Sequence, residues 1–181
     1  MKKVFLIHGF EGSPNGGWRP WLMTELDLRD VYAAALVMPT PAQPIEEEWI
    51  AEIARHINIE DEVYLVGHSL GVTAILRYLE TAPVQIAGAV LVSGPCNATG
   101  NTKIDNFFKI PFNYAIIRQR VGKAAIIHSD NDHLVSLDDA KILEKELEAT
   151  LTVIHEGGHL GSHDGWSELP QALEALEKMG V

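Results

Sequence analysis

The sequence predicts an α/β fold in which a parallel sheet of about six strands has helices on both faces. Short runs of Val, Ile and Ala alternate with helical patterns from one end of the chain to the other. Such alternation is typical of parallel strands joined by right-handed helical crossovers. The 181 residues, 46% hydrophobic and 22% charged, suit one domain with its own core. We therefore expect residues 1–181 to form a single domain, with residues 95–122 as a small lid or insertion.

The expected strands are apolar runs of the kind buried on both faces of a sheet. They are Val4–Ile7, Val31–Met38, Val63–Val66, Ile86–Val92, Ala124–Ile127 and Leu151–Ile154. The expected helices between them are Trp18–Leu26, Ile45–Ile57, Leu70–Leu79, Leu137–Leu147 and Leu169–Lys178. The segment Pro95–Gly122 has no clear strand, but its aromatic residues argue against disorder, and we expect a helix near Asn113–Val121.

Charge and cysteine content exclude several classes of protein. A formal net charge of −11 argues against a nucleic-acid partner and against docking on an anionic membrane. The single cysteine, Cys96, allows neither an intrachain disulfide nor a cysteine-rich metal site. The apolar run Val4–Ile7 is too short for a signal peptide, and no segment has the ~18 apolar residues of a membrane helix. We expect a cytoplasmic protein.

The segment Val63–Ala74 combines a buried strand, a Gly-x-Ser-x-Gly pentapeptide and the start of a helix. A nucleophilic serine projects from a sharp, strained turn, where bulky side chains two positions away would collide with the neighbouring strand and helix. Gly67 and Gly71 occupy those positions around Ser69. The pattern predicts the nucleophile elbow of an α/β-hydrolase fold, with Ser69 as the nucleophile.

A glycine-containing loop, His8–Ser13, follows the first expected strand. In α/β-hydrolases this loop and the residue after the nucleophile supply the backbone N–H groups of the oxyanion hole. We expect these donors to be Phe10 and Leu70, with Glu11 as the alternative to Phe10.

A catalytic serine needs a histidine base and an acid that fixes the tautomer of the histidine. In this fold the acid and then the histidine lie on loops after late strands. The loop after the fifth strand supplies Asp132 as the expected acid, because Asp-x-x-Val before a helix is its usual form, with Asp130 as the alternative. The loop after the sixth strand supplies His159, preceded by two glycines, with His163 as the alternative.

The segment His155–His159 also matches His-Glu-x-x-His, the signature of zinc proteases, with His163 as a third ligand. That chemistry needs both histidines on one helical face. Gly157 and Gly158 would cost such a helix roughly 2 kcal/mol relative to alanine, and the preceding Leu151–Ile154 is expected to be a strand. We expect neither a metal nor another cofactor.

These motifs resemble those of the small serine hydrolases similar to the bacterial YdeN proteins and human retinoblastoma-binding protein 9. The matching pieces are His8–Ser13 with Trp18 and Trp21, Gly67–Gly71, Asn131-Asp132 and Gly157–His159. The resemblance implies a minimal three-layer α/β-hydrolase fold without the antiparallel first hairpin of larger relatives. It supports Ser69, Asp132 and His159 as the triad.

The resemblance also implies esterase-like activity on small acyl substrates. We expect a carboxylesterase-like serine hydrolase that forms an acyl-enzyme, with Phe107 and Phe108 building a small apolar substrate pocket. The alternative is a protein-binding module that keeps the fold with little turnover, and a protein partner fits either interpretation. The roles of His133 and His163, which flank the acid and the base, are open.

Overall fold

The computed structural model describes all 181 residues and contains one parallel sheet of six strands. The strands lie in the order β2-β1-β3-β4-β5-β6. Their bounds are β1 Lys2–Ile7, β2 Tyr32–Ala35, β3 Glu62–His68, β4 Ile86–Val92, β5 Val121–Ser129 and β6 Thr150–Ile154. The chain moves from β1 to one edge and then returns to the other side of β1, so the order reverses between β1 and β3. In open α/β sheets, the carboxyl ends of the strands at such a reversal form the usual ligand site.

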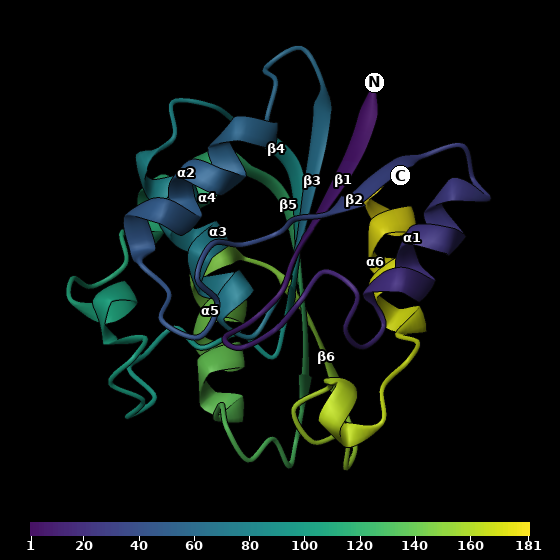
Figure 1. The fold of residues 1–181 in the computed structure, drawn as a ribbon. Helices are drawn as coiled ribbons and strands as arrows, with labels where there is room; N and C mark the ends of the chain where they lie inside the picture. Colours follow the sequence, from purple (N-terminus) through teal and green to yellow (C-terminus); the bar gives the residue numbers. More distant parts are fainter.

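Helices cover both faces of the sheet, which gives the three layers seen edge-on in Figure 1. The helices α1 and α6 lie on one face, and α2, α3, α4 and α5 lie on the other. Their bounds are α1 Arg19–Asp27, α2 Glu46–His56, α3 Leu70–Thr81, α4 Tyr114–Arg120, α5 Leu137–Leu147 and α6 Pro170–Met179, with short 3₁₀ turns η1 Asp105–Phe108 and η2 Ser162–Asp164. The predicted fold class is confirmed.

Two hydrophobic cores hold the layers together, one on each face. Strand β1 shows why: Phe5 and Ile7 belong to the larger core under α2–α5, whereas Val4 and Leu6 belong to the smaller core under α1 and α6. Alternate side chains of a strand point to opposite faces. A strand covered on both faces is therefore apolar at nearly every position, as the predicted runs were.

The two edge strands differ from the prediction. Strand β2 is shorter than the expected Val31–Met38, because the chain leaves the sheet after Leu36 and Val37 is 73% exposed. Strand β6 was expected to be buried, yet Val153 is 48% exposed. An edge strand has a neighbour on one side only, and the apolar run by itself does not reveal this position.

The segment after β4 contains η1 and α4 and packs onto the outside of α3. The expected helix is confirmed as α4, with the Asn113 side chain accepting a hydrogen bond from Ile116 N. The Arg77 guanidinium of α3 donates to Phe107 O at 2.9 Å and lies 3.7 Å from the centre of the Phe112 ring. These contacts fix the insertion against the larger core.

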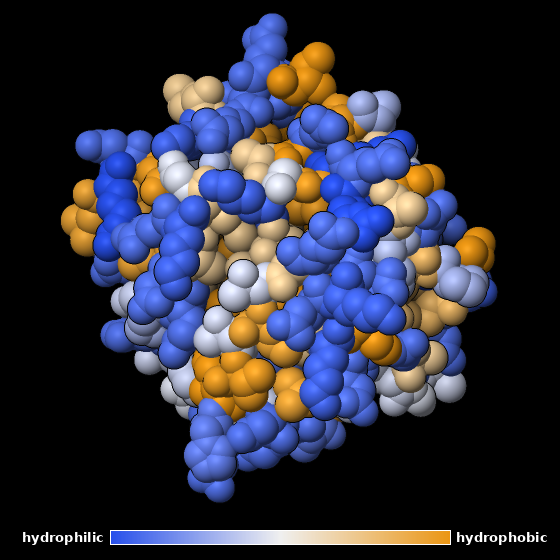
Figure 2. Space-filling model, turned by 180° about the vertical axis from the view of Figure 1, so that it is seen from behind, coloured by the Kyte–Doolittle hydropathy of each residue, from blue (hydrophilic) through white to orange (hydrophobic).

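The surface opposite the view of Figure 1 is largely hydrophilic. From behind, hydrophilic side chains cover most of the surface, and the hydrophobic ones are scattered or lie in hollows bordered by hydrophilic ones (Figure 2). No helix combines the length and apolar character needed to cross a membrane.

Candidate active site

Ser69 occupies the tight turn between β3 and α3. Its backbone dihedral angles, φ 55° and ψ −124°, are rare for a residue with a side chain and are typical of a strained functional turn. A Cβ on Gly67 would lie 2.7 Å from Val72 N, and one on Gly71 would lie 2.3 Å from Ile7 O. Only glycine fits at these two positions, as the sequence pattern predicted.

The loop after β1 crosses directly over Ser69. A Cβ on Gly9 would lie 2.8 Å from Ser69 Cβ. The N–H of Glu11 donates to Pro41 O at 2.8 Å, so it is occupied and cannot serve as an oxyanion donor. The N–H of Phe10 has no such partner, and Leu70, the first residue of α3, has no acceptor within its helix. The two predicted donors thus have no acceptor within the chain, and Phe10 lines the same cavity as Ser69.

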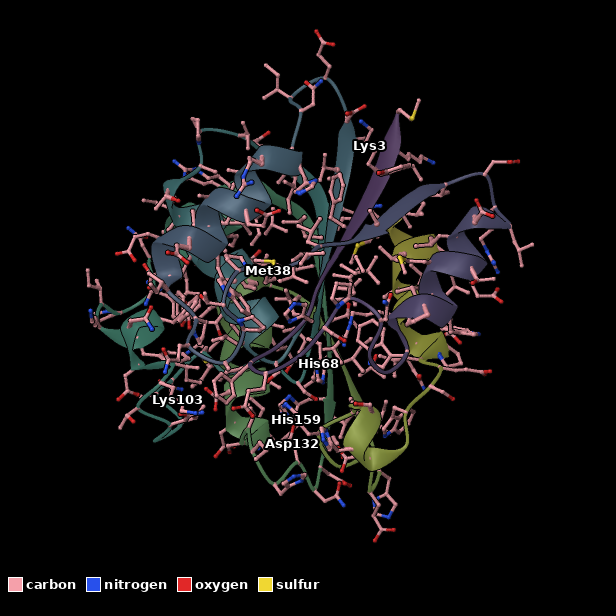
Figure 3. The ribbon with its side chains drawn as sticks, viewed as in Figure 1. Lys3, Met38, His68, Lys103, Asp132 and His159 are labelled. Atoms are coloured by element: carbon pink, nitrogen blue, oxygen red, sulfur yellow. The ribbon has the colours of Figure 1, made fainter.

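Asp132 and His159 meet across the loops that follow β5 and β6. His159 Nδ1 lies 2.8 Å from Asp132 Oδ2 and 3.1 Å from Oδ1. Because a carboxylate only accepts hydrogen bonds, Nδ1 carries the proton and Nε2 remains an acceptor. In Figure 3, His68, His159 and Asp132 lie close together at one end of the sheet.

Asp132 is held in its ionised form. Burial opposes ionisation, but the hydrogen bonds from His159 and from the N–H groups of Leu134 and Val135 outweigh it and keep the pKa of Asp132 below its usual value. No hydrogen bond joins Ser69 Oγ to the His159 ring in this arrangement, although both line one cavity. Such contacts commonly tighten only in the substrate complex.

The alternative acid, Asp130, faces a different histidine. Its Oδ2 accepts from His155 Nδ1 at 2.7 Å and its Oδ1 from Glu156 N at 2.8 Å. The bond from His155 is the main cause that keeps the pKa of Asp130 below its usual value. The structure therefore brings Asp132, and not Asp130, to His159.

The zinc-protease interpretation lacks its required geometry. Residues His155–His159 form a turn, and the two histidines contact different aspartates. The third ligand of that interpretation, His163, is exposed at the cavity rim. No three His, Cys, Asp or Glu side chains lie close enough together to hold a metal ion.

His68, the residue before Ser69, holds the loop of His159. Its Nε2 donates to His159 O at 2.9 Å, and the two ring centres are 5.0 Å apart. Burial is the main cause that lowers the pKa of His68 to about 3, and the nearby Arg19 guanidinium adds to it. It is therefore neutral at neutral pH, with its proton on Nε2. Sequence patterns missed this role, because the elbow motif leaves this position open.

A cavity of about 520 Å³ opens over Ser69. Its walls come from the loop after β1, the start of α1, the elbow and the loops of Asp132 and His159, and only three of its 18 lining residues are hydrophobic. Phe107 and Phe108 are not among them. Phe107 is fully buried, with its ring 5.8 Å from that of Trp49, and Phe108 packs against the same core. The prediction that these two residues form an apolar substrate pocket is wrong, because their side chains attach the insertion to the core.

Residues 4–178 match the model of the serine hydrolase family. This chain belongs to that family. This chain is 34% identical to YdeN of Bacillus subtilis strain 168 over 179 residues, which are 97% of this chain and 94% of YdeN. It is 24% identical to the serine hydrolase RBBP9 of Rattus norvegicus over 163 residues, which are 88% of this chain and 86% of RBBP9. The predicted resemblance is confirmed.

Solved structures agree with the fold. The crystal structure of the ydeN gene product of B. subtilis superposes on this serine hydrolase with a TM-score of 0.92 and 32% identity, covering 99% of this chain and 98% of that one. Est1E from Butyrivibrio proteoclasticus, at 15% identity, gives a TM-score of 0.71 over 98% of this chain and 86% of that one. The first neighbour supports the family assignment, and the second shows the α/β-hydrolase fold alone.

Proposed function

We propose that this serine hydrolase is a carboxylesterase-like enzyme that cleaves small acyl esters. In this proposal Ser69 is the nucleophile, His159 the base, and Asp132 the acid that orients the base. The observation that supports it best is the placement of His159. Its Nδ1 faces a buried carboxylate, while its ring lines the cavity that contains Ser69.

The first half of the reaction forms an acyl-enzyme. His159 Nε2 accepts the Ser69 Oγ proton as Oγ attacks the ester carbonyl carbon. The N–H groups of Phe10 and Leu70 stabilise the resulting oxyanion, and ionised Asp132 stabilises the imidazolium. The tetrahedral intermediate collapses when His159 passes its proton to the departing alkoxide oxygen. The C–O bond to the alcohol breaks, and the acyl group remains on Ser69.

The second half releases the acid. Water takes the place of the alcohol, and His159 Nε2 accepts one of its protons as it attacks the acyl carbonyl. His159 then protonates Ser69 Oγ as the acyl–oxygen bond breaks. A cavity of about 520 Å³ falls within the range of small-molecule sites, which agrees with a small ester.

Hydrolysis of 4-nitrophenyl acetate and butyrate by the wild type and by Ser69→Ala tests this proposal. We expect a burst of 4-nitrophenol from the wild type, because an acyl-enzyme accumulates, and loss of nearly all turnover in the variant. Ser167→Ala, at an exposed serine outside the cavity, is the matched control. A folded wild type that cleaves no ester and does not react with a phosphonate would favour the binding-module alternative.

A further inference from the structure

We propose that the substrates of this serine hydrolase carry a carboxylate group and that Arg19 binds it. A buried guanidinium without an acidic partner lines the same cavity as Ser69. This inference rests on the proposed function, because it names the substrate class of that site.

Arg19 uses only one side of its guanidinium within the chain. Nε and Nη2 both donate to Ser13 O, at 3.2 Å and 3.0 Å. A Cβ on Gly16 would lie 2.8 Å from Nη2, so the absence of a side chain there leaves room for the guanidinium. Five N–H bonds are present in an arginine side chain. The two on Nη1 and the second on Nη2 are left over, and one N–H from each nitrogen can donate to a carboxylate in a bidentate pair.

The charge of Arg19 has no counter-ion. The residue is 6% exposed, and no carboxylate pairs with it. Burial alone lowers the pKa of Arg19 to about 10, so the guanidinium stays charged at neutral pH. A buried, unpaired charge is costly, and buried charges in proteins are normally paired. A role for Arg19 in binding an anionic ligand explains why its charge has no partner within the chain.

Arg19 lies beside the nucleophile elbow. Its guanidinium is 5.8 Å from the ring of Trp18, which in turn packs edge-on against His68 at 6.1 Å between ring centres. The charge of Arg19 also contributes to the lowered pKa of His68. Because Arg19 and Ser69 line one cavity of about 520 Å³, a small ester whose carboxylate is bound to Arg19 can place its carbonyl carbon at Ser69 Oγ.

The remaining charged groups of the cavity disfavour a ligand with two negative charges. Glu11 is exposed and lies 3.7 Å from Lys103 Nζ, and Asp164 accepts from His159 N at 3.0 Å. His133 and His163 are exposed at the rim. Beside Arg19, the two carboxylates repel a phosphate dianion more strongly than a singly charged carboxylate, so we assign the ligand as a carboxylate.

Two pairs of esters, each matched except for the charge, test the assignment. The first is mono-4-nitrophenyl adipate with its methyl ester, which puts the carboxylate on the acyl side. The second is 4-acetoxy-3-nitrobenzoate with its amide, which puts it on the alcohol side. In addition, 4-acetoxyphenyl phosphate is compared with 4-acetoxybenzoate. The variants are Arg19→Met, Arg19→Lys and, as the control, Arg55→Met, whose side chain is 71% exposed.

In at least one pair, the wild type should cleave the charged ester with a kcat/KM about 10- to 100-fold above that of the neutral one, the effect of a hydrogen bond between charged groups. The ratio should fall to about 1 in Arg19→Met and lie between these values in Arg19→Lys, which keeps the charge but loses the planar fork. Arg55→Met should keep the wild-type ratio. If Arg19→Met does not fold, the ratio of kcat/KM between charged and neutral esters in the wild type and in Arg19→Lys tests the inference.

Three results would overturn the inference. A wild-type ratio near 1 in both pairs, or equal losses for charged and neutral esters in both Arg19 variants, would mean that Arg19 only anchors the loop at Ser13. A preference for the phosphate would reject the carboxylate. If the wild type cleaves neutral and charged esters equally well and a phosphonate labels Ser69, this inference fails but the proposed function stands. If the wild type cleaves no ester and no phosphonate labels Ser69, the proposed function fails as well.

Discussion

The substitution Gly71→Ala should sharply lower the rate of ester hydrolysis while leaving the chain folded. A Cβ there would lie 2.3 Å from Ile7 O and 2.8 Å from His8 O, whereas ordinary contacts begin near 3.4 Å. Both obstacles are backbone atoms at the end of β1, so the strand and the elbow must separate by about 1 Å. Because Gly9 and Phe10 follow immediately, this movement displaces the loop proposed to bind the oxyanion from Ser69. A misplacement of about 1 Å costs about 100-fold in rate, and overpacking costs about 1–3 kcal/mol of stability.

The assay compares Gly71→Ala with Gly88→Ala. A Cβ on Gly88 would lie 2.7 Å from Met179 Sδ, at the flexible end of a side chain. Gly88 is about 13 Å along β4 from Val92, whose carbonyl accepts from Ser69 N. We expect kcat/KM for 4-nitrophenyl butyrate to fall about 100-fold in Gly71→Ala only, while urea unfolding shows a loss of stability in both variants. Wild-type kcat/KM in Gly71→Ala would refute the close packing of β1 on the elbow.

Three further predictions concern the acid and the insertion. Asp132→Asn should lower kcat by on the order of 10⁴, because asparagine favours the wrong imidazole tautomer of the base. Asp130→Asn should lower kcat less than about tenfold, and equal losses from the two substitutions in steady-state assays would move the acid elsewhere. Because the pKa of Asp132 is lowered on folding, its ionisation stabilises the chain above about pH 4 and loses this effect as the pH falls through the lower folded value. The difference in unfolding free energy between wild type and Asp132→Asn should therefore shrink between about pH 6 and pH 3, and a constant difference in urea titrations would contradict this. Phe107→Ala should cost about 3–5 kcal/mol of stability but leave the acyl-length preference of a 4-nitrophenyl ester series as it is; a changed preference would return Phe107 to the substrate pocket.

The elbow was predictable because its geometry restricts residue types. Gly67 and Gly71 are required by backbone atoms that come within 3 Å of any added Cβ, so the requirement is written into the sequence. The positions of Asp132 and His159 were predictable for a related reason. Parallel strands end at one edge of the sheet, so the loops after β5 and β6 had to lie near each other.

The substrate side of the site was not predictable in the same way. The aromatic content of the insertion predicted buried side chains, but it did not predict which surface they pack against. In the structure, Phe107 packs against Trp49 and does not line the cavity of Ser69. Arg19 stands before a proline at the start of a helix, where a charged residue is ordinarily solvated. Only the folded chain shows that it is buried without an acidic partner.

The central claim is that His159, oriented by Asp132, activates Ser69. The most direct measurement is reaction of the folded chain with a fluorophosphonate at neutral pH, followed by peptide mapping by mass spectrometry. We expect one adduct per chain, on Ser69, which is absent in Ser69→Ala and forms at least about 10³-fold more slowly in His159→Gln. An adduct on another serine, or wild-type labelling of Ser69 in His159→Gln, would contradict the claim.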